Sequence, residues 1–251
     1  MFLCFFVILC AAMVFLQVNG SIFSGVTAHS EIPYTQADFF VRASGFKLFA
    51  LCYTPLIVIF MLYCCRNDYL TNRIIRYRHA TSIWFLQVAK ALLMALGFAL
   101  VLTALGFVMS LFMAEEGINF DSVYSYFAYS TRGETIPNPP LAYLIFLFFL
   151  YAALTLFLVN LIWLVLDALF SKKWVALVIS FALGVLSAAS SSITSVAIPL
   201  PCTLATIWYT SWLPGASHGF VYLWAAVAVM IVAGFLLFRI RGVPLLKGRG
   251  L

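Results

Sequence analysis

Charged residues are scarce in this chain. Only 9% of its 251 residues are Asp, Glu, Lys or Arg, and its mean hydropathy is +1.09. Soluble domains carry about 25% charged residues. The longest polar stretches, Asn19–Arg42 and Glu115–Pro140, are too short to bury a core of their own. These features exclude a water-soluble catalytic domain.

Motifs of catalysis and metal binding are lacking as well. The sequence contains no GxxxxGK[ST] phosphate loop, no GxSxG nucleophile motif and no HExxH zinc motif. Its six cysteines form no CxxC pair, and its three histidines, His29, His79 and His218, are scattered. We therefore expect no catalytic residue, no metal site and no cofactor on this chain.

Long apolar runs are what the chain has instead. Six of them, each 17 to 26 residues long, are long enough as helices to cross a hydrocarbon layer of about 30 Å. In lipid every backbone amide needs an internal partner, so we expect helices rather than irregular chain. The sequence predicts one all-α, polytopic membrane domain over residues 1–251, with spans at Phe2–Val18, Phe46–Cys65, Ala91–Met113, Leu141–Leu166, Val175–Ile198 and Phe220–Phe238.

The basic residues predict the orientation of these spans. With the N-terminus in the cytoplasm and alternating spans, eleven of the fourteen Lys and Arg residues fall on the cytoplasmic side. Only Arg42, Lys47 and Arg132 fall outside, where most acidic residues also lie. We expect both termini in the cytoplasm and six crossings. The first run lacks a basic start and a clear cleavage site, so we interpret it as a retained span rather than a signal peptide.

The connection between the second and third spans is basic and amphipathic. Asp68 is suited to cap a helix that places Leu70, Ile74 and Tyr77 on one face and Arg73, Arg76 and His79 on another, and Arg78 adds a further positive charge. One interpretation is a helix that rests on anionic lipid headgroups. The other is a docking element for a cytoplasmic partner.

The connection before the last span is apolar but broken. Two prolines interrupt the fifth run at Pro199 and Pro201, and the segment ends at Pro214-Gly215. It is too short to span and too apolar for open water, which favours a re-entrant or interfacial segment anchored by Trp208, Tyr209 and Trp212.

Two spans carry polar or small residues that deserve a functional hypothesis. Asn160 and Asp167 in the fourth span are seven residues apart and share a helix face. They fit either an interhelical amide bond with an interfacial ion pair to Lys90, Lys172, Lys173 or Arg66, or a substrate-facing or gating role.

The fifth span pairs Gly184 with Ala188 and Ser187 with Ser191, which favours close helix packing or a polar wall along a translocation route. The phenylalanines Phe146, Phe148 and Phe149 are expected to face lipid.

The layout resembles the ABC-2-type permease, the membrane subunit of an ATP-binding-cassette exporter. The segment Asp68–His79 looks like the coupling helix of that family, and Pro199–Gly215 looks like its extracellular re-entrant helices. The run from Tyr69 to Trp84 is similar to segments of small permeases in bacterial peptide and bacteriocin-immunity exporters. Members usually open with a cytoplasmic amphipathic helix, whereas the first span here begins at Phe2.

The resemblance implies a transport subunit that is not itself an enzyme. A separate soluble ATPase carrying ATP and Mg²⁺ would dock on Asp68–His79, and a second permease chain would complete the exit route in the bacterial plasma membrane. The cargo would be a peptide, a lipid or a hydrophobic small molecule, and no nucleic acid is involved. The alternatives are a non-transport scaffold or accessory subunit and, less favoured for want of clustered catalytic groups, an intramembrane enzyme acting on lipid.

Overall fold

The computed structural model describes residues 34–45, 49–65, 80–115, 117–170, 173–193 and 219–241. Within these residues the secondary structure is helical and no β-strand forms, although Thr35 and Glu115 make an isolated parallel bridge. The all-α prediction is confirmed for this part of the chain. In chain order the elements are α2 (Gln36–Ala43), the π-helix η1 (Phe49–Tyr53), α4 (Thr54–Cys65), α6 (Ala80–Met113), α7 (Tyr126–Ser130), α8 (Leu141–Leu169), α9 (Lys173–Ile193) and α11 (Gly219–Arg241).

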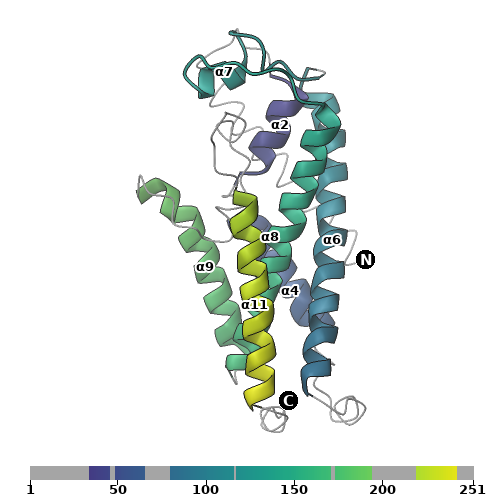
Figure 1. The fold of residues 1–251 in the computed structure, drawn as a ribbon, viewed down its shortest axis with the longest axis vertical. Coiled ribbons are helices and arrows are strands. Elements are labelled where there is room, and N and C mark those ends of the chain that lie inside the picture. The colour runs from purple at the N-terminus through teal and green to yellow at the C-terminus, as the bar shows by residue number, and fades with distance from the viewer. Residues whose placement is uncertain are drawn as a thin grey trace.

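The long helices form an antiparallel bundle. Consecutive members alternate in direction, so that α6 and α9 begin at the end of the bundle where α4, α8 and α11 finish (Figure 1). We call this the inner end, because the predicted topology assigns it to the cytoplasm. The opposite, outer end carries α2 and α7 (Figure 1).

Three of these helices are long and apolar enough to cross a membrane, with apolar stretches at Thr81–Phe112, Leu141–Leu169 and Phe220–Ile240. Two further predicted spans appear as shorter apolar helices, Phe49–Cys65 and Trp174–Leu186. The first predicted span, Phe2–Val18, lies outside the described residues. The structure thus shows three of the six predicted spans as membrane-length helices.

The predicted span boundaries hold best where proline fixes them. The helix α8 begins at Leu141, directly after Pro139-Pro140, as the sequence predicts. By contrast, α6 begins by Ala80 rather than at Ala91. Gln87 and Lys90 made the segment before Ala91 look polar, but both lie within the helix, and the side chain of Gln87 is fully buried.

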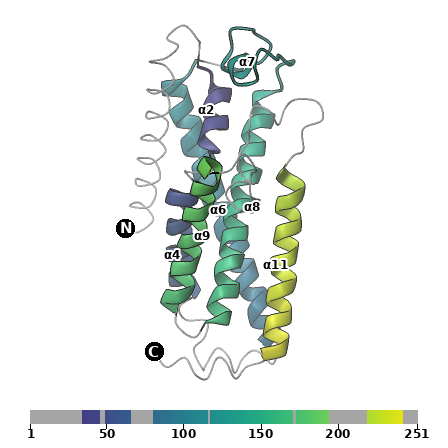
Figure 2. The same ribbon diagram turned by 90° about the vertical axis from the view of Figure 1, so that its left-hand side faces the viewer.

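The helix α8 is the centre of the bundle. It packs against α2, α4, α6, α9 and α11, and 67% of its most apolar stretch is buried inside the protein. Figure 2 shows α8 with α4 and α9 on one side and α11 on the other. The expectation that the phenylalanines of this span face lipid is wrong for Phe148, which is only 2% exposed and contacts the Phe40 ring of α2 at 5.4 Å between centroids.

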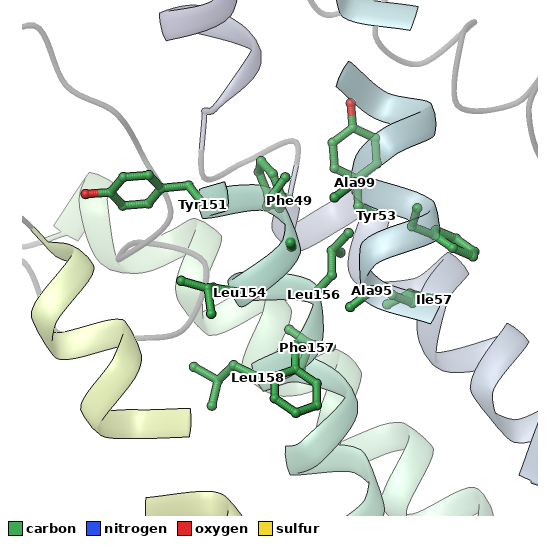
Figure 3. Close-up of a cluster of buried hydrophobic side chains, with 14 of the residues drawn as sticks. Phe49, Tyr53, Ile57, Ala95, Ala99, Tyr151, Leu154, Leu156, Phe157 and Leu158 are labelled. Carbon is green, nitrogen blue, oxygen red and sulfur yellow. The ribbon is translucent and has the colours of Figure 1, made fainter. Parts of the chain in front are cut away.

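The core around α8 combines small and large side chains. Figure 3 shows Leu156 of α8 beside Ala95 of α6, with Ile57 of α4 on the same side, in one cluster of buried side chains. Alanine on the facing helix lets two backbones approach closely, which is how helices gain packing energy in a membrane. Buried residues of α4, α6, α8 and α11 join this one hydrophobic cluster, and the partly buried Phe181 of α9 packs against it.

The second apolar run does not form a regular helix throughout. Its first turn, Phe49–Tyr53, is a π-helix, and Pro55 follows two residues later. Proline has no backbone N–H and its ring clashes with the carbonyl four residues earlier, so the preceding turn widens. The hydroxyl of Thr54 donates to the Phe49 carbonyl oxygen at 2.8 Å and supports the widened turn.

The outer end is closed by α2 and the segment after α6. The polar connection Asn19–Ser44, expected to be an exterior loop, contains the short helix α2, whose residues are buried between α6 and α8 except for the half-buried Arg42. The backbone pairs Gln36 N with Glu115 O at 3.0 Å and Glu115 N with Tyr34 O at 2.8 Å, which fixes the start of α2 to the end of α6. Phe120 and Phe127 of the following segment stack at 4.6 Å and are fully buried.

Candidate functional site: a buried polar cluster at the inner half of the bundle

Asn160 and Asp167 both lie buried in α8, as their shared helix face predicts. Asn160 has no exposed surface, and its side-chain Nδ2 donates to the backbone oxygen of Ala91 in α6 at 3.3 Å. This bond is the interhelical amide contact that the sequence predicts. It also fixes which turns of the antiparallel helices α6 and α8 face each other.

Asp167 lies two residues before the end of α8 and is 1% exposed. It is seven residues from Asn160, so it lies about 10 Å further toward the inner end on nearly the same face. Of the basic partners expected for it, Lys90 lies in α6 and is half-buried, whereas Arg66, Lys172 and the side chain of Lys173 lie outside the described residues. An ion pair of Asp167 with any of them stays a prediction.

Three further polar side chains lie in the same region and were missed by the sequence analysis. Trp84 and Gln87 of α6 are fully buried, and Trp163 of α8 is 1% exposed. Trp84 precedes Ala91 by seven residues and therefore lies on nearly the same face of α6. The sequence contains a signal for them, because Trp84, Gln87 and Ala91 follow the spacing of one helix face. The residues before Ala91 were nevertheless assigned to the connection that precedes the third span. We call Trp84, Gln87, Asn160, Trp163 and Asp167 the polar cluster.

Several atoms of the polar cluster are buried without a hydrogen-bond partner. They are the indole Nε1 atoms of Trp84 and Trp163 and the side-chain Oδ1 of Asn160. Leaving a buried donor or acceptor unsatisfied costs about 1–3 kcal/mol each. Thr155 Oγ1 is also unsatisfied, but this residue lies on another side of α8 from Asn160.

The helix α11 covers the α6 side of the polar cluster. Gly234 stands directly against the Trp84 ring, where a Cβ atom would meet ring carbons at 2.1 and 2.2 Å. Phe238, one turn further on, contacts the same ring at 5.4 Å between centroids. Trp84 is therefore held between two helices, and glycine is required at 234 for α11 to approach.

A second polar group lies at the outer end, around α2. The Asp38 carboxylate accepts a hydrogen bond from the backbone N of Thr35 at 2.9 Å, and the Thr35 hydroxyl oxygen accepts one from the backbone N of Asp38 at 3.5 Å, which forms a capping box at the start of α2. Arg42 donates to the Tyr126 hydroxyl, and its guanidinium carbon lies 4.6 Å from the Tyr126 ring centroid. The Thr35-x-x-Asp38 spacing could have revealed this helix, but its eight residues are too few for a periodicity signal.

Tyr34 completes this outer group. Its ring meets that of Tyr126 edge-on at 6.2 Å, and its hydroxyl is buried without a hydrogen-bond partner. Burial, and then the negative charge of Asp38, raise the pKa of the Tyr34 phenol well above its ordinary value. The phenol therefore stays neutral, and the positive charge of Arg42 only partly offsets this effect.

The small residues of α9 mark one close helix contact. A Cβ atom on Gly184 would lie 2.9 Å from the Ala50 carbonyl oxygen of η1, so the prediction of close packing is confirmed at this residue. The contact brings α9 against the π-helical turn that precedes Pro55. Ser187 and Ser191 belong to α9, but their side chains lie outside the described residues.

The remaining predicted site residues lie outside the described residues. This holds for the expected coupling helix, with Asp68, Arg73, Arg76, Arg78 and His79, and for the expected re-entrant segment with Trp208, Tyr209 and Trp212. Their roles stay predictions from the sequence.

Comparison with known proteins gives no relative on which to base a function. No protein-family model matches the sequence. No curated protein and no solved structure matches it either. The functional argument therefore depends on the residues and the geometry of this chain.

Proposed function

We propose that this chain is the membrane-spanning permease subunit of an ABC-2-type exporter. It would move a peptide, a lipid or a hydrophobic small molecule across the cell membrane, and a separate ATPase subunit would drive it. The chain itself would perform no bond chemistry. Its helices would convert the docking motion of the ATPase into exposure of a substrate site, which is a two-state switch.

The observation that carries this proposal is the antiparallel order of the helices around their basic connections. The helices α4 and α6 are joined by residues 66–79, and they meet that connection at the inner end (Figure 1). The same end of the bundle also has basic residues by their place in the sequence. They are Lys172 and Lys173 at the junction of α8 with α9, and Arg239 near the end of α11. This arrangement supports one cationic face on which cytosolic machinery could dock.

The polar cluster gives secondary support. A scaffold protein gains nothing from unsatisfied polar atoms between its two most extensively packed helices. Polar groups at membrane depth are costly, and they commonly mark a route for substrate or ions. A scaffold or accessory subunit is the competing function. It predicts that no ATPase binds the segment Asp68–His79.

The decisive experiment reverses the charge of two arginines in the expected coupling helix. The full-length chain carrying R73E and R76E is purified from its native membrane in mild detergent and compared with the unmodified chain. We expect a co-purifying soluble ATPase with Walker motifs on the unmodified chain, and loss of both that ATPase and ATP hydrolysis on the variant. The matched control, K247E with R249E, reverses two charges on the same predicted face and should retain both.

Two results would reject the proposal. One is an ATPase that stays bound and active on R73E/R76E. The other is that no ATPase accompanies the unmodified chain while other membrane proteins do, which would favour a scaffold or accessory subunit.

A separate labelling experiment tests the orientation. Cysteine introduced at Ser171 should react with an impermeant thiol reagent only from the cytoplasmic side, and cysteine at Ser130 only from the exterior. The reverse pattern would place Asp68–His79 outside the cell and remove the docking argument.

A further inference from the structure

The polar cluster has more hydrogen-bonding capacity than the protein itself satisfies. Trp84 Nε1 and Trp163 Nε1 are donors, Asn160 Oδ1 is an acceptor, and none of the three has a hydrogen-bond partner. All three side chains are at least 99% buried. Native proteins satisfy the great majority of buried polar atoms, with protein groups, ordered water or a ligand.

The three atoms belong to one part of the α6–α8 interface. The bond from Asn160 to the Ala91 carbonyl oxygen sets the facing turns of the two antiparallel helices. Trp84 lies seven residues before Ala91, and Trp163 lies three residues after Asn160, so both extend from this contact toward the inner end. A single level of the bundle, about 10 Å high, therefore contains two donors and one acceptor.

The chemistry of these groups defines what could bind among them. Two N–H donors and one carbonyl acceptor complement a small neutral group that both accepts and donates hydrogen bonds. The carboxyl group of Asp167 at the same level disfavours an anion. Buried water molecules typically make two to four hydrogen bonds each to such groups, and because the three atoms extend over about 10 Å of the bundle, more than one water molecule would be needed to satisfy them.

We propose that the polar cluster is a hydrated binding site between α6, α8 and α11, with water as its ligand in the resting chain. Trp84 lies four residues after the start of α6, and Asp167 lies two residues before the end of α8. Both residues therefore lie within about one helical turn of the inner ends of the described helices, which is the side from which water would enter. Thr155 does not belong to this site, since it lies on another side of α8.

This inference deepens the proposed function, since it gives the route a wet inner half where polar groups of a cargo could replace water. Its test needs neither the ATPase nor a known cargo. A dry polar cluster would reject the inference and leave the docking experiment unaffected.

The first test measures water access by thiol chemistry. Asn160→Cys and Leu161→Cys are each introduced into a full chain whose six native cysteines are replaced by alanine or serine. Leu161 has the same burial and nearly the same depth as Asn160 but lies about 100° around the helix. In permeabilised vesicles, a small hydrophilic thiosulfonate reagent should modify the cysteine at 160 at least about tenfold faster, a difference of about 1.4 kcal/mol. Equal rates would overturn the inference.

The second test keeps the native shape of the interface. In a chain that retains Trp84 and Trp163 as its only tryptophans, with phenylalanine at the other four positions, Asn160→Leu removes the acceptor with little change of volume. We expect the tryptophan emission to shift to shorter wavelength, because the bridging water loses one of its partners. Thr155→Val, equally buried, should leave the emission unchanged. An identical spectrum in both variants would show that neither tryptophan is hydrated through Asn160.

Discussion

The helices α8 and α11 have the same hydropathy, but α8 lies mostly inside the bundle and α11 lies mostly on its surface. In α8, 67% of the most apolar stretch is buried, against 17% in α11. Lipid tails are as apolar as leucine side chains, so apolar character alone does not bring one helix to the centre. What distinguishes α8 is its polar side chains: Asn160 and Asp167 are both buried, whereas α11 contains no Asn, Gln, Asp or Glu.

The largest expected difference between the two helices comes from their tryptophans. Trp163 of α8 is 1% exposed, and Trp224 of α11 is 49% exposed. Trp163→Ala should lower the free energy of unfolding by about 3–5 kcal/mol, because it leaves a cavity that the core cannot fill. Trp224→Ala should change it by less than about 0.5 kcal/mol, because lipid replaces the ring. Unfolding by sodium dodecyl sulfate in mixed micelles, followed by circular dichroism, measures both, and similar losses would contradict the central position of α8.

A pair of glycines tests the contact between α11 and α6. Gly234→Ala would place a methyl group within the Trp84 ring contact, and we expect a loss of about 1–3 kcal/mol from overpacking. Gly97→Ala in α6 is the control, because no atom lies within 4 Å of its Cβ position. The same unfolding assay compares them. Equal stability of the two variants would mean that α11 does not press on Trp84.

Removing the N-terminal cap of α2 tests how far the outer half of α8 depends on α2 for its cover. Thr35→Ala removes the side-chain acceptor that starts α2 and should cost about 1 kcal/mol. Backbone amides of residues 36–43 should exchange with deuterium faster, while those of 219–241 keep their rates, since α11 makes no main contact with α2. Ser130→Ala, an exposed serine of the same outer end, should leave both unchanged. Uniformly faster exchange would show that α2 stabilises the whole bundle.

The smallest effect is expected from alkaline pH at Tyr34. Its folded-state pKa is raised above the ordinary 10.0, so the phenol stays neutral in the folded chain while the unfolded chain ionises. This contribution to stability is fully present below pH 10.0 and is lost progressively as the pH rises above it. Tyr34→Phe should unfold with a weaker pH dependence in that range and with similar stability at neutral pH, since the hydroxyl has no hydrogen-bond partner. An unchanged alkaline slope would reject the assignment.

The sequence predicts the parts of this fold that depend on long, local patterns. Runs of apolar residues predict the helices, Pro139-Pro140 predicts the start of α8, and the seven-residue spacing predicts that Asn160 and Asp167 share a face. It does not predict which helix lies at the centre, because a bilayer removes the difference between core-facing and lipid-facing leucine. For the same reason Phe148 was wrongly assigned to lipid.

The missed elements are those whose signal is short or mixed. The buried helix α2 has only eight residues, three of them polar or charged, and resembles a loop. Lys90 and Gln87 interrupt the hydropathy of α6, so its first turns and with them Trp84 were assigned to a connection. The π-helix could have been suspected from Thr54-Pro55, since a proline inside an apolar run must disturb the turn before it.

The unbroken length of α6 has a mechanical consequence. Its 34 residues form a rod of about 51 Å, well beyond the thickness of the hydrocarbon layer. Near one tip it carries Trp84, and near the other Gly106 presses against Phe40 of α2, with a Cβ position 3.3 Å from that ring. A tilt imposed at the inner tip would displace the far tip in the opposite sense. The rigid helix α6 would thus transmit motion from one side of the bundle to the other without any change in its own hydrogen bonds.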